Sequence, residues 1–161
     1  MELRGRTLAA AAIVLTTCFI LFPPRDGDTR LRITVLDVGQ ADAIVIRTPL
    51  GHTLLVDAGG RLERGATANG DSTAENVGER VVVPFLRRNG VRHIDAILLS
   101  HPHGDHAGGI APVLRNYGEA DVFADSGQKY GGYAYNDALT TARAESVPIA
   151  YPRAGIVCVW R

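Results

Sequence analysis

A cluster of three histidines and one aspartate constrains this chain more than any other feature of its sequence. His101, His103, Asp105 and His106 fall within six residues, directly after a hydrophobic run at 94–100. Divalent metals prefer neutral imidazole nitrogens and carboxylate oxygens, several at once, at about 2.0–2.2 Å. Because one residue separates His101 from His103, an extended segment places both rings on the same side. The cluster therefore predicts a metal site.

The place of the cluster in the chain is typical of a functional loop. The hydrophobic run that ends at Ser100 predicts a buried strand, and the residues from Ala107 onward predict a helix. Sites in open α/β sheets collect on the loops after the carboxyl ends of strands. Gly104 supplies the tight turn that lets Asp105 and His106 reach a second ion. Histidines that only cap a helix or bond locally are the alternative, which suits a lone histidine better than this cluster.

The rest of the chain predicts an α/β fold. Three β-rich runs with tight connections come first and indicate an antiparallel meander, after which helices and strands alternate. Pro84 conflicts with the helix in which it falls and implies a kink or a late start. We expect strands at 31–37, 43–47, 53–57, 94–100, 121–124 and 147–151, and helices at 77–89, 107–117 and 136–145.

Residues 1–24 predict an export signal or a membrane anchor. Arg4 and Arg6 precede an uncharged run at 7–22, which two prolines end. A helix over that run spans about 24 Å, short of the roughly 30 Å hydrocarbon core. The segment is therefore either a signal peptide or a minimal single-span anchor, with a linker at 25–30 behind it. We expect an exported or membrane-tethered domain outside the cytoplasm; a buried helix of a soluble domain is the alternative.

Charge and cysteine content exclude two classes of protein. The 17 basic and 17 acidic residues cancel, which argues against a broadly basic nucleic-acid binder. Cys18 and Cys158 alone cannot form a disulfide framework. The 161 residues suit a single domain, and a hydrophobic content of 46% predicts a packed core rather than wholesale disorder.

The histidine cluster and three upstream segments resemble the metallo-β-lactamase superfamily. His-x-His-x-Asp-His at 101–106 is the metal motif of that superfamily. LDVGQADA at 36–43 is similar to the LDVGQGDA signature of the branch containing the extracellular domain of ComEC-type competence proteins, with Ala41 replacing the second glycine. The segments at 55–59 and 82–91 resemble the family's LIDTG strand end and the helix before its metal strand. The resemblance implies an αββα sandwich with a two-metal site at one edge.

The resemblance also implies roles for the clustered residues. His101 and His103 would bind a first ion, and Asp105 and His106 would bind a second. The two divalent ions would be Zn or Mn, and they would activate a water for attack on a substrate. Asp105 would in addition be the catalytic residue that orients this water.

Three residues outside the cluster receive implied roles near it. Asp57 would hold the histidine loop by accepting hydrogen bonds. A cap of the turn at the strand end explains Asp57 equally well. Gln40 and Asp42 would line the entrance of the site, and loop structure is their alternative.

The second half of the expected site has no counterpart in this sequence. The superfamily completes its site with an aspartate, often in a Gly-Asp pair, and with a further histidine. No histidine follows His106 in this chain. We therefore expect 31–161 to be a C-terminally incomplete metallo-β-lactamase-like domain, with only the N-terminal half of the sandwich and an N-terminal apolar helix.

Three functions compete. The 36–43 signature, the metal motif and the N-terminal segment favour an exported metal-dependent hydrolase of phosphodiester bonds, with DNA as one substrate. A hydrolase of lactones, thioesters or β-lactams on the same scaffold is the second reading, and a truncated, non-catalytic remnant is the third. The membrane is an expected partner through the N-terminal segment, and nothing in the sequence indicates an oligomer.

Overall fold

The chain divides into two compact units, Met1–Arg30 and Leu31–Arg161. Most of the predicted export or anchor segment at 1–24 and of the linker at 25–30 lies outside the described residues. Within the described part of the chain, no helix is both long and apolar enough to cross a membrane. The structure, a computed structural model, describes residues 16–17, 30–61, 77–118 and 120–155.

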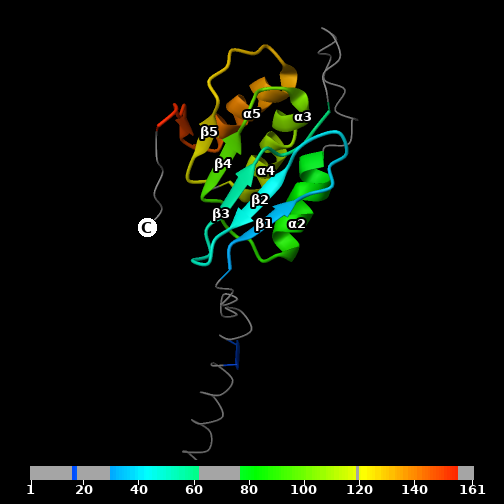
Figure 1. The fold of residues 1–161 in the computed structure, drawn as a ribbon, viewed down its shortest axis with the longest axis vertical. Helices are drawn as coiled ribbons and strands as arrows, with labels where there is room; N and C mark the ends of the chain where they lie inside the picture. Colours follow the sequence, from blue (N-terminus) through cyan, green and yellow to red (C-terminus); the bar gives the residue numbers. More distant parts are fainter. Residues whose placement is uncertain (1–15, 18–29, 62–76, 119, 156–161) are drawn as a thin grey trace, which may run out of the picture. The chain divides into compact units, whose positions relative to one another are not determined.

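The described residues of the second unit form one mixed sheet of six strands, which lie side by side in chain order (Figure 1). The first three strands pair antiparallel, as the predicted meander requires, and the later strands pair parallel. Parallel pairing follows from the helical crossovers that join the later strands. The strands are β1 (Arg32–Val35), β2 (Ile44–Arg47), β3 (Thr53–Val56), β4 (Ala96–Leu99), β5 (Phe123–Asp125) and β6 (Ile149–Ala150).

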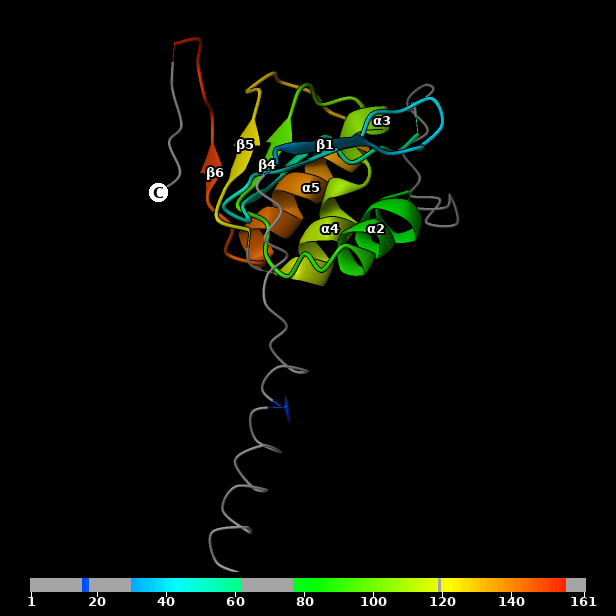
Figure 2. The same ribbon diagram turned by 60° about the horizontal axis from the view of Figure 1, so that its bottom comes forward.

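Three helices, α2, α4 and α5, cover the same face of the sheet (Figure 2). A π-helical turn runs directly into α2, and Pro84 lies in the first turn of that α-helix. Proline is well tolerated there because its fixed φ suits the first turn, so the late start resolves the predicted conflict. The helical elements are η1 (Gly78–Val82), α2 (Val83–Arg88), α3 (Gly104–Ala107), α4 (Ile110–Tyr117) and α5 (Tyr133–Ala144).

The core lies between these helices and one face of the sheet. Val45, Leu55 and Phe123 come from three different strands and are almost completely buried. Leu86 from α2 and Leu114 from α4 belong to the same hydrophobic cluster. Burying each large apolar side chain contributes about 1.5–3 kcal/mol. The helical layer therefore holds the sheet, and with it the loops at the sheet edge, in one arrangement.

The opposite face of the sheet is also apolar, but none of the described helices covers it. Ile33 and Val35 on β1 are 60% and 69% exposed. Their partners on β2, Ile46 and Ile44, are half-buried. An apolar sheet face is normally buried against a second layer. The described residues thus form two layers, one of helices and one of strands, and the outer face of the sheet is apolar and uncovered by the described helices.

Some predicted boundaries are wrong, and tertiary contacts explain the differences. The helix predicted at 107–117 begins only at Ile110, because the N–H of Gly109 donates to the carbonyl of Gly59 in the loop after β3, and Ala107 instead ends the separate short helix α3. The helix predicted at 136–145 begins three residues earlier, at Tyr133. Tyrosine has only a middling intrinsic helix propensity, but burial of the ring of Tyr135 extends the helix.

Candidate metal centre

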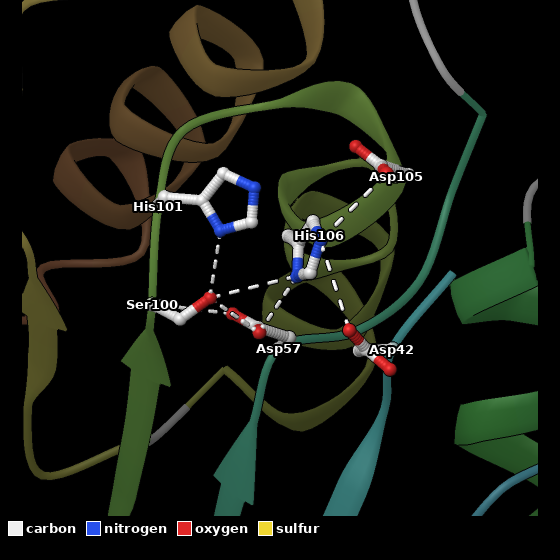
Figure 3. Close-up of polar contacts among 6 residues, drawn as sticks. All are labelled: Asp42, Asp57, Ser100, His101, Asp105 and His106. Atoms are coloured by element: carbon white, nitrogen blue, oxygen red, sulfur yellow. Dashed lines mark hydrogen bonds and ion pairs between the residues drawn. The ribbon is translucent and has the colours of Figure 1, made fainter. Parts of the chain in front are cut away.

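The histidine cluster lies where the carboxyl ends of two neighbouring strands meet (Figure 3). β4 leads into Ser100 and His101, and β3 leads into Asp57. Since β3 and β4 are parallel neighbours, both ends reach the same edge of the sheet. The short helix α3 then carries Asp105 and His106 back over this edge.

Close backbone contacts hold the loop after β3 against α3 and the start of α4. A Cβ on Gly60 would lie 2.0 Å from the carbonyl oxygen of Gly104, and one on Gly109 would lie 2.0 Å from that of Ala58. The N–H of Ala58 donates to the carbonyl of His106 at 3.0 Å. Because only glycine allows such an approach, Gly60 and Gly109 let the end of β3 lie beside the histidine cluster.

Asp57 is a buried carboxylate that joins the strand ends to the helix. It is 3% exposed, and its backbone has a positive φ of 54°. Oδ1 accepts the backbone N–H of Ser100 at 2.8 Å, and Oδ2 accepts the Ser100 hydroxyl at 2.6 Å. Oδ2 also lies 2.8 Å from Nδ1 of His106. The carboxylate therefore forms hydrogen bonds with both Ser100 and His106 of the histidine loop. Whether it also affects a bound metal stays a prediction.

His106 presents its other ring nitrogen to two further carboxylates. Nε2 lies 3.6 Å from Oδ2 of Asp105 and 3.8 Å from Oδ2 of Asp42. Both distances exceed a hydrogen bond. They match the spacing of about 3–4 Å expected between atoms that share one ion at about 2.0–2.2 Å. The ring of His106 is only 11% exposed, so its orientation is well defined.

A second set of ligand atoms lies beside this one. One ligand atom each from His101, His103 and Asp105 lies within 4.8 Å of the others, close enough to hold one metal ion. The ring centroids of His101 and His106 are 3.8 Å apart, and the two ring planes are tilted by 51°. Oδ1 of Asp105 is buried and has no hydrogen-bond partner in the described part of the chain. A cation would satisfy this oxygen, so the residues fit a divalent metal.

The predicted entrance residues differ in their position. Asp42 is close to the cluster through its carboxylate, and its backbone carbonyl accepts the N–H of Gly59 at 2.7 Å. Its side chain is 62% exposed, which places it at the open side of the cluster. Gln40 is exposed, and among the described residues no hydrogen bond joins its side chain to the histidines.

Two residues that the sequence did not single out also contact the cluster. The hydroxyl of Ser100 lies 3.0 Å from Nδ1 of His101 and bonds Asp57 on its other side. Its position directly before the first histidine is a signal that sequence reasoning could have used. Tyr130 lies with its ring 5.1 Å from that of His103. Nothing in its sequence context indicates this contact.

The mixed sheet and the His/Asp cluster at its edge define an α/β domain with a possible metal site. The family model of the metallo-beta-lactamase superfamily matches residues 36–148, which include the whole cluster. The chain belongs to this superfamily, as its metal motif implied.

The chain is also distantly similar to competence and recombination proteins. ComE operon protein 3 of Bacillus subtilis is 27% identical over 115 residues, which cover 70% of this chain and 15% of the relative. Recombination protein 2 of Haemophilus influenzae is 30% identical over 120 residues, 73% of this chain and 14% of the relative. Competence protein ComA of Neisseria gonorrhoeae is 32% identical over 111 residues, which cover 68% of this chain and 14% of the relative. The chain spans about one seventh of the length of these relatives.

Among solved structures, the chain is similar to the crystal structure of a diphosphatase from the PhnP family. The match has a TM-score of 0.33 and 18% identity, and it covers 70% of this chain and 37% of the other. A likeness this low carries no argument about fold or function.

Proposed function

We propose that this chain carries the metal centre of a hydrolase that cleaves phosphodiester bonds, DNA among them. The observation that supports it most is the buried, unpartnered Oδ1 of Asp105, in a residue that also lies within ligand spacing of His101 and His103. A buried carboxylate oxygen without a partner costs about 1–3 kcal/mol. Divalent cations bound there would offset this cost and supply the Lewis acidity that hydrolysis needs.

The ligand roles divide between two Zn or Mn ions. His101 and His103 would hold one ion. Asp105 and His106 would hold the other, and the spacing of Asp42 from Nε2 of His106 supports a contribution of this carboxylate. Asp105 borders both groups of ligands, which suits it to orient the attacking water.

The substrate class rests on the distant relatives. One is named a competence protein, one a recombination protein and one a protein of the ComE operon. The first two names support a substrate of DNA. The backbone of DNA is a phosphodiester, which gives the proposed substrate class. Lactones, thioesters and β-lactams are the alternative substrates, and a non-catalytic domain is the third candidate.

The apolar sheet face supports the fold part of the proposal. Exposed Ile33 and Val35 are suited to packing against a second apolar sheet, about 10 Å away. We propose that the described residues correspond to one half of an αββα sandwich. The basic and apolar pattern of residues 1–24 supports export of the domain or its attachment to a membrane.

A titration with zinc or manganese, followed by calorimetry, tests the metal centre. His101→Ala should weaken binding by more than about 100-fold, since even the loss of a residue that only orients a ligand costs about 10- to 100-fold. His93→Ala is the companion variant, because His93, Asp95 and Asp121 form a second group of possible metal ligands outside the cluster. It should leave binding at the proposed centre unchanged. Equal binding by the His101 variant would refute the proposed centre.

The reaction is tested with bis(p-nitrophenyl) phosphate and single-stranded DNA. We expect cleavage only with added metal, and none with His101→Ala. Cleavage of a lactone, thioester or β-lactam in place of the phosphodiester would replace the proposed substrate class. Tight metal binding without any cleavage would support the non-catalytic alternative.

A further inference from the structure

The histidine rings of the cluster are held in different ways. The ring of His106 bonds Asp57, and that of His101 lies 3.0 Å from the hydroxyl of Ser100. His103 has no such side-chain hydrogen bond within the described part of the chain. Its ring instead meets two other rings, that of His101 at 4.8 Å and that of Tyr130 at 5.1 Å. The orientation of His103 therefore depends on aromatic packing.

The ring of Tyr130 is well suited to this packing. The two planes are tilted by 57°, and tilted aromatic pairs with centroids 4.5–7 Å apart attract each other. Tyr130 is half-buried and packs against the hydrophobic core, so its ring is anchored on the protein side. His103 is exposed. Among the described residues outside the histidine cluster, Tyr130 is the one whose ring packs against that of His103.

A buried carboxylate anchors both ends of the loop that carries Tyr130. This loop, 126–132, joins β5 to α5. At its start, Oδ1 of Asp125 accepts the N–H of Gly127 at 3.2 Å. Beyond its end, the hydroxyl of Tyr135 donates to Oδ2 of the same carboxylate at 2.6 Å. Asp125 is fully buried, so neither bond competes with water.

The protonation of Tyr135 keeps this anchor in place. Burial, together with the bond to the Asp125 carboxylate, raises the pKa of the Tyr135 phenol well above its usual range. The phenol therefore remains a donor at every physiological pH. Two hydrogen bonds to the Asp125 carboxylate therefore fix the loop, one near each end, and neither requires a bound metal.

We propose that Tyr130 is a positioning residue for His103, presented by a loop that the Asp125–Tyr135 hydrogen bond anchors. The proposal rests on the proposed metal centre, because a ligand ring must aim one nitrogen at the ion. A ring held in that direction before binding loses less rotational freedom when the metal arrives. Tyr130 thereby plays for His103 the part that Asp57 plays for His106.

The test compares zinc affinities of four variants by calorimetry. Tyr130→Leu keeps apolar volume but removes the ring, and it should weaken zinc binding about 3- to 10-fold, the size of one aromatic pair. Tyr130→Phe should bind as the original chain does, since no hydrogen bond of the Tyr130 hydroxyl is found among the described residues. Tyr133→Leu, at an exposed tyrosine three residues away, should have no effect. Tyr135→Phe, which frees Asp125, should weaken zinc binding in the same direction as Tyr130→Leu.

A double-mutant comparison separates positioning from general loss of structure. In a His103→Ala background, Tyr130→Leu should cause no further loss of zinc affinity, because the ring that it orients is gone. An equal loss in both backgrounds would overturn the proposal and assign Tyr130 to packing alone. Unchanged affinity of Tyr130→Leu in the original background would overturn it as well.

A measurement without metal keeps this outcome distinct from failure of the metal centre. In the metal-free protein, the ring protons of His103 should shift in the NMR spectrum when Tyr130→Leu removes the neighbouring ring current, and should stay in place with Tyr130→Phe. If the original chain binds no zinc, the proposed function fails. The His103 shift then still decides whether Tyr130 holds this ring, and its absence would refute the contact.

Discussion

Asp57 and Asp105 lie at the same sheet edge but in opposite hydrogen-bonding situations. Both oxygens of Asp57 are bonded by Ser100, and one also by His106. Oδ1 of Asp105 is buried without a described partner. A satisfied carboxylate stabilises the fold, whereas an unsatisfied one opposes it until a ligand arrives. One aspartate therefore builds the site, and the other is available to a cation.

Replacing Asp57 should affect metal binding and stability together. Asp57→Asn is the gentlest change, because asparagine tolerates the positive φ and can still accept the N–H of Ser100. We expect a loss of zinc affinity of about 10- to 100-fold and a decrease in the free energy of unfolding of about 1–3 kcal/mol. Calorimetric titration and urea denaturation measure the two effects.

Asp137→Asn is the matched control for this change, since Asp137 pairs with the half-exposed Arg115 and belongs to neither group of possible metal ligands. It should leave both quantities close to those of the original chain. If Asp57→Asn lowered stability but left zinc affinity unchanged, Asp57 would be only the cap of the strand end.

At the scale of elements, the break between α3 and α4 sets the geometry of the cluster. The sequence analysis predicts a continuous helix over 107–117. The chain instead interrupts it at two glycines, and the N–H of Gly109 donates to the carbonyl of Gly59 at 2.9 Å. This bond ties the helix pair to the loop after β3, which carries Asp57. The helix is therefore interrupted by a contact between distant segments, at two residues whose own helix propensity is low.

A single methyl group at this contact should be costly. In Gly109→Ala the new Cβ would lie 2.0 Å from the carbonyl oxygen of Ala58, so backbone must move. We expect the free energy of unfolding to fall by about 1–3 kcal/mol, as for overpacked cores. Zinc affinity should fall too, because α3 moves relative to Asp57. Thermal denaturation and zinc titration measure these changes.

Gly131→Ala serves as the control for the glycine substitution. A Cβ there meets nothing within 4 Å, and alanine is expected to be neutral or slightly stabilising. Equal stability of the two alanine variants would show that the loop after β3 does not pack as closely as the structure has it.

At the scale of the whole molecule, helices bury one face of the sheet and leave the other face largely exposed among the described residues. Val45 and Leu55 point into the helical layer and are almost completely buried. Ile33 and Val35 lie on the other face and are largely exposed. A sheet buried on one side only still has apolar surface available for a second layer. The stability of the described unit should therefore come mainly from the helical side.

Substitutions on the two faces should differ in their cost. Leu55→Ala should lower the free energy of unfolding by about 2–5 kcal/mol, because it leaves a cavity in the core. Ile33→Ala should cost about 1 kcal/mol or less, the range of strand propensity alone. Urea denaturation of both variants at several protein concentrations measures the difference. Equal losses would mean that the second face is covered in solution.

Short-range features of this protein could be predicted from the sequence with good accuracy. The meander is read from alternation and tight turns, each within a few residues. The candidate metal ligands fall within six positions. Strand and helix ends were less accurate, as at Tyr133, because burial of neighbouring side chains moves them. The N-terminal segment at 1–24 stays a prediction.

The sequence by itself determined the class of fold, the family and the ligand-type residues of the cluster, because each depends on residues close together in the chain. Only the tertiary structure decided how the ligands are supported. The bond from Asp57 to His106, the approach of Asp42 and the ring of Tyr130 against His103 each join segments separated by tens of residues. Such contacts arise from strand order and backbone packing, which no local pattern encodes.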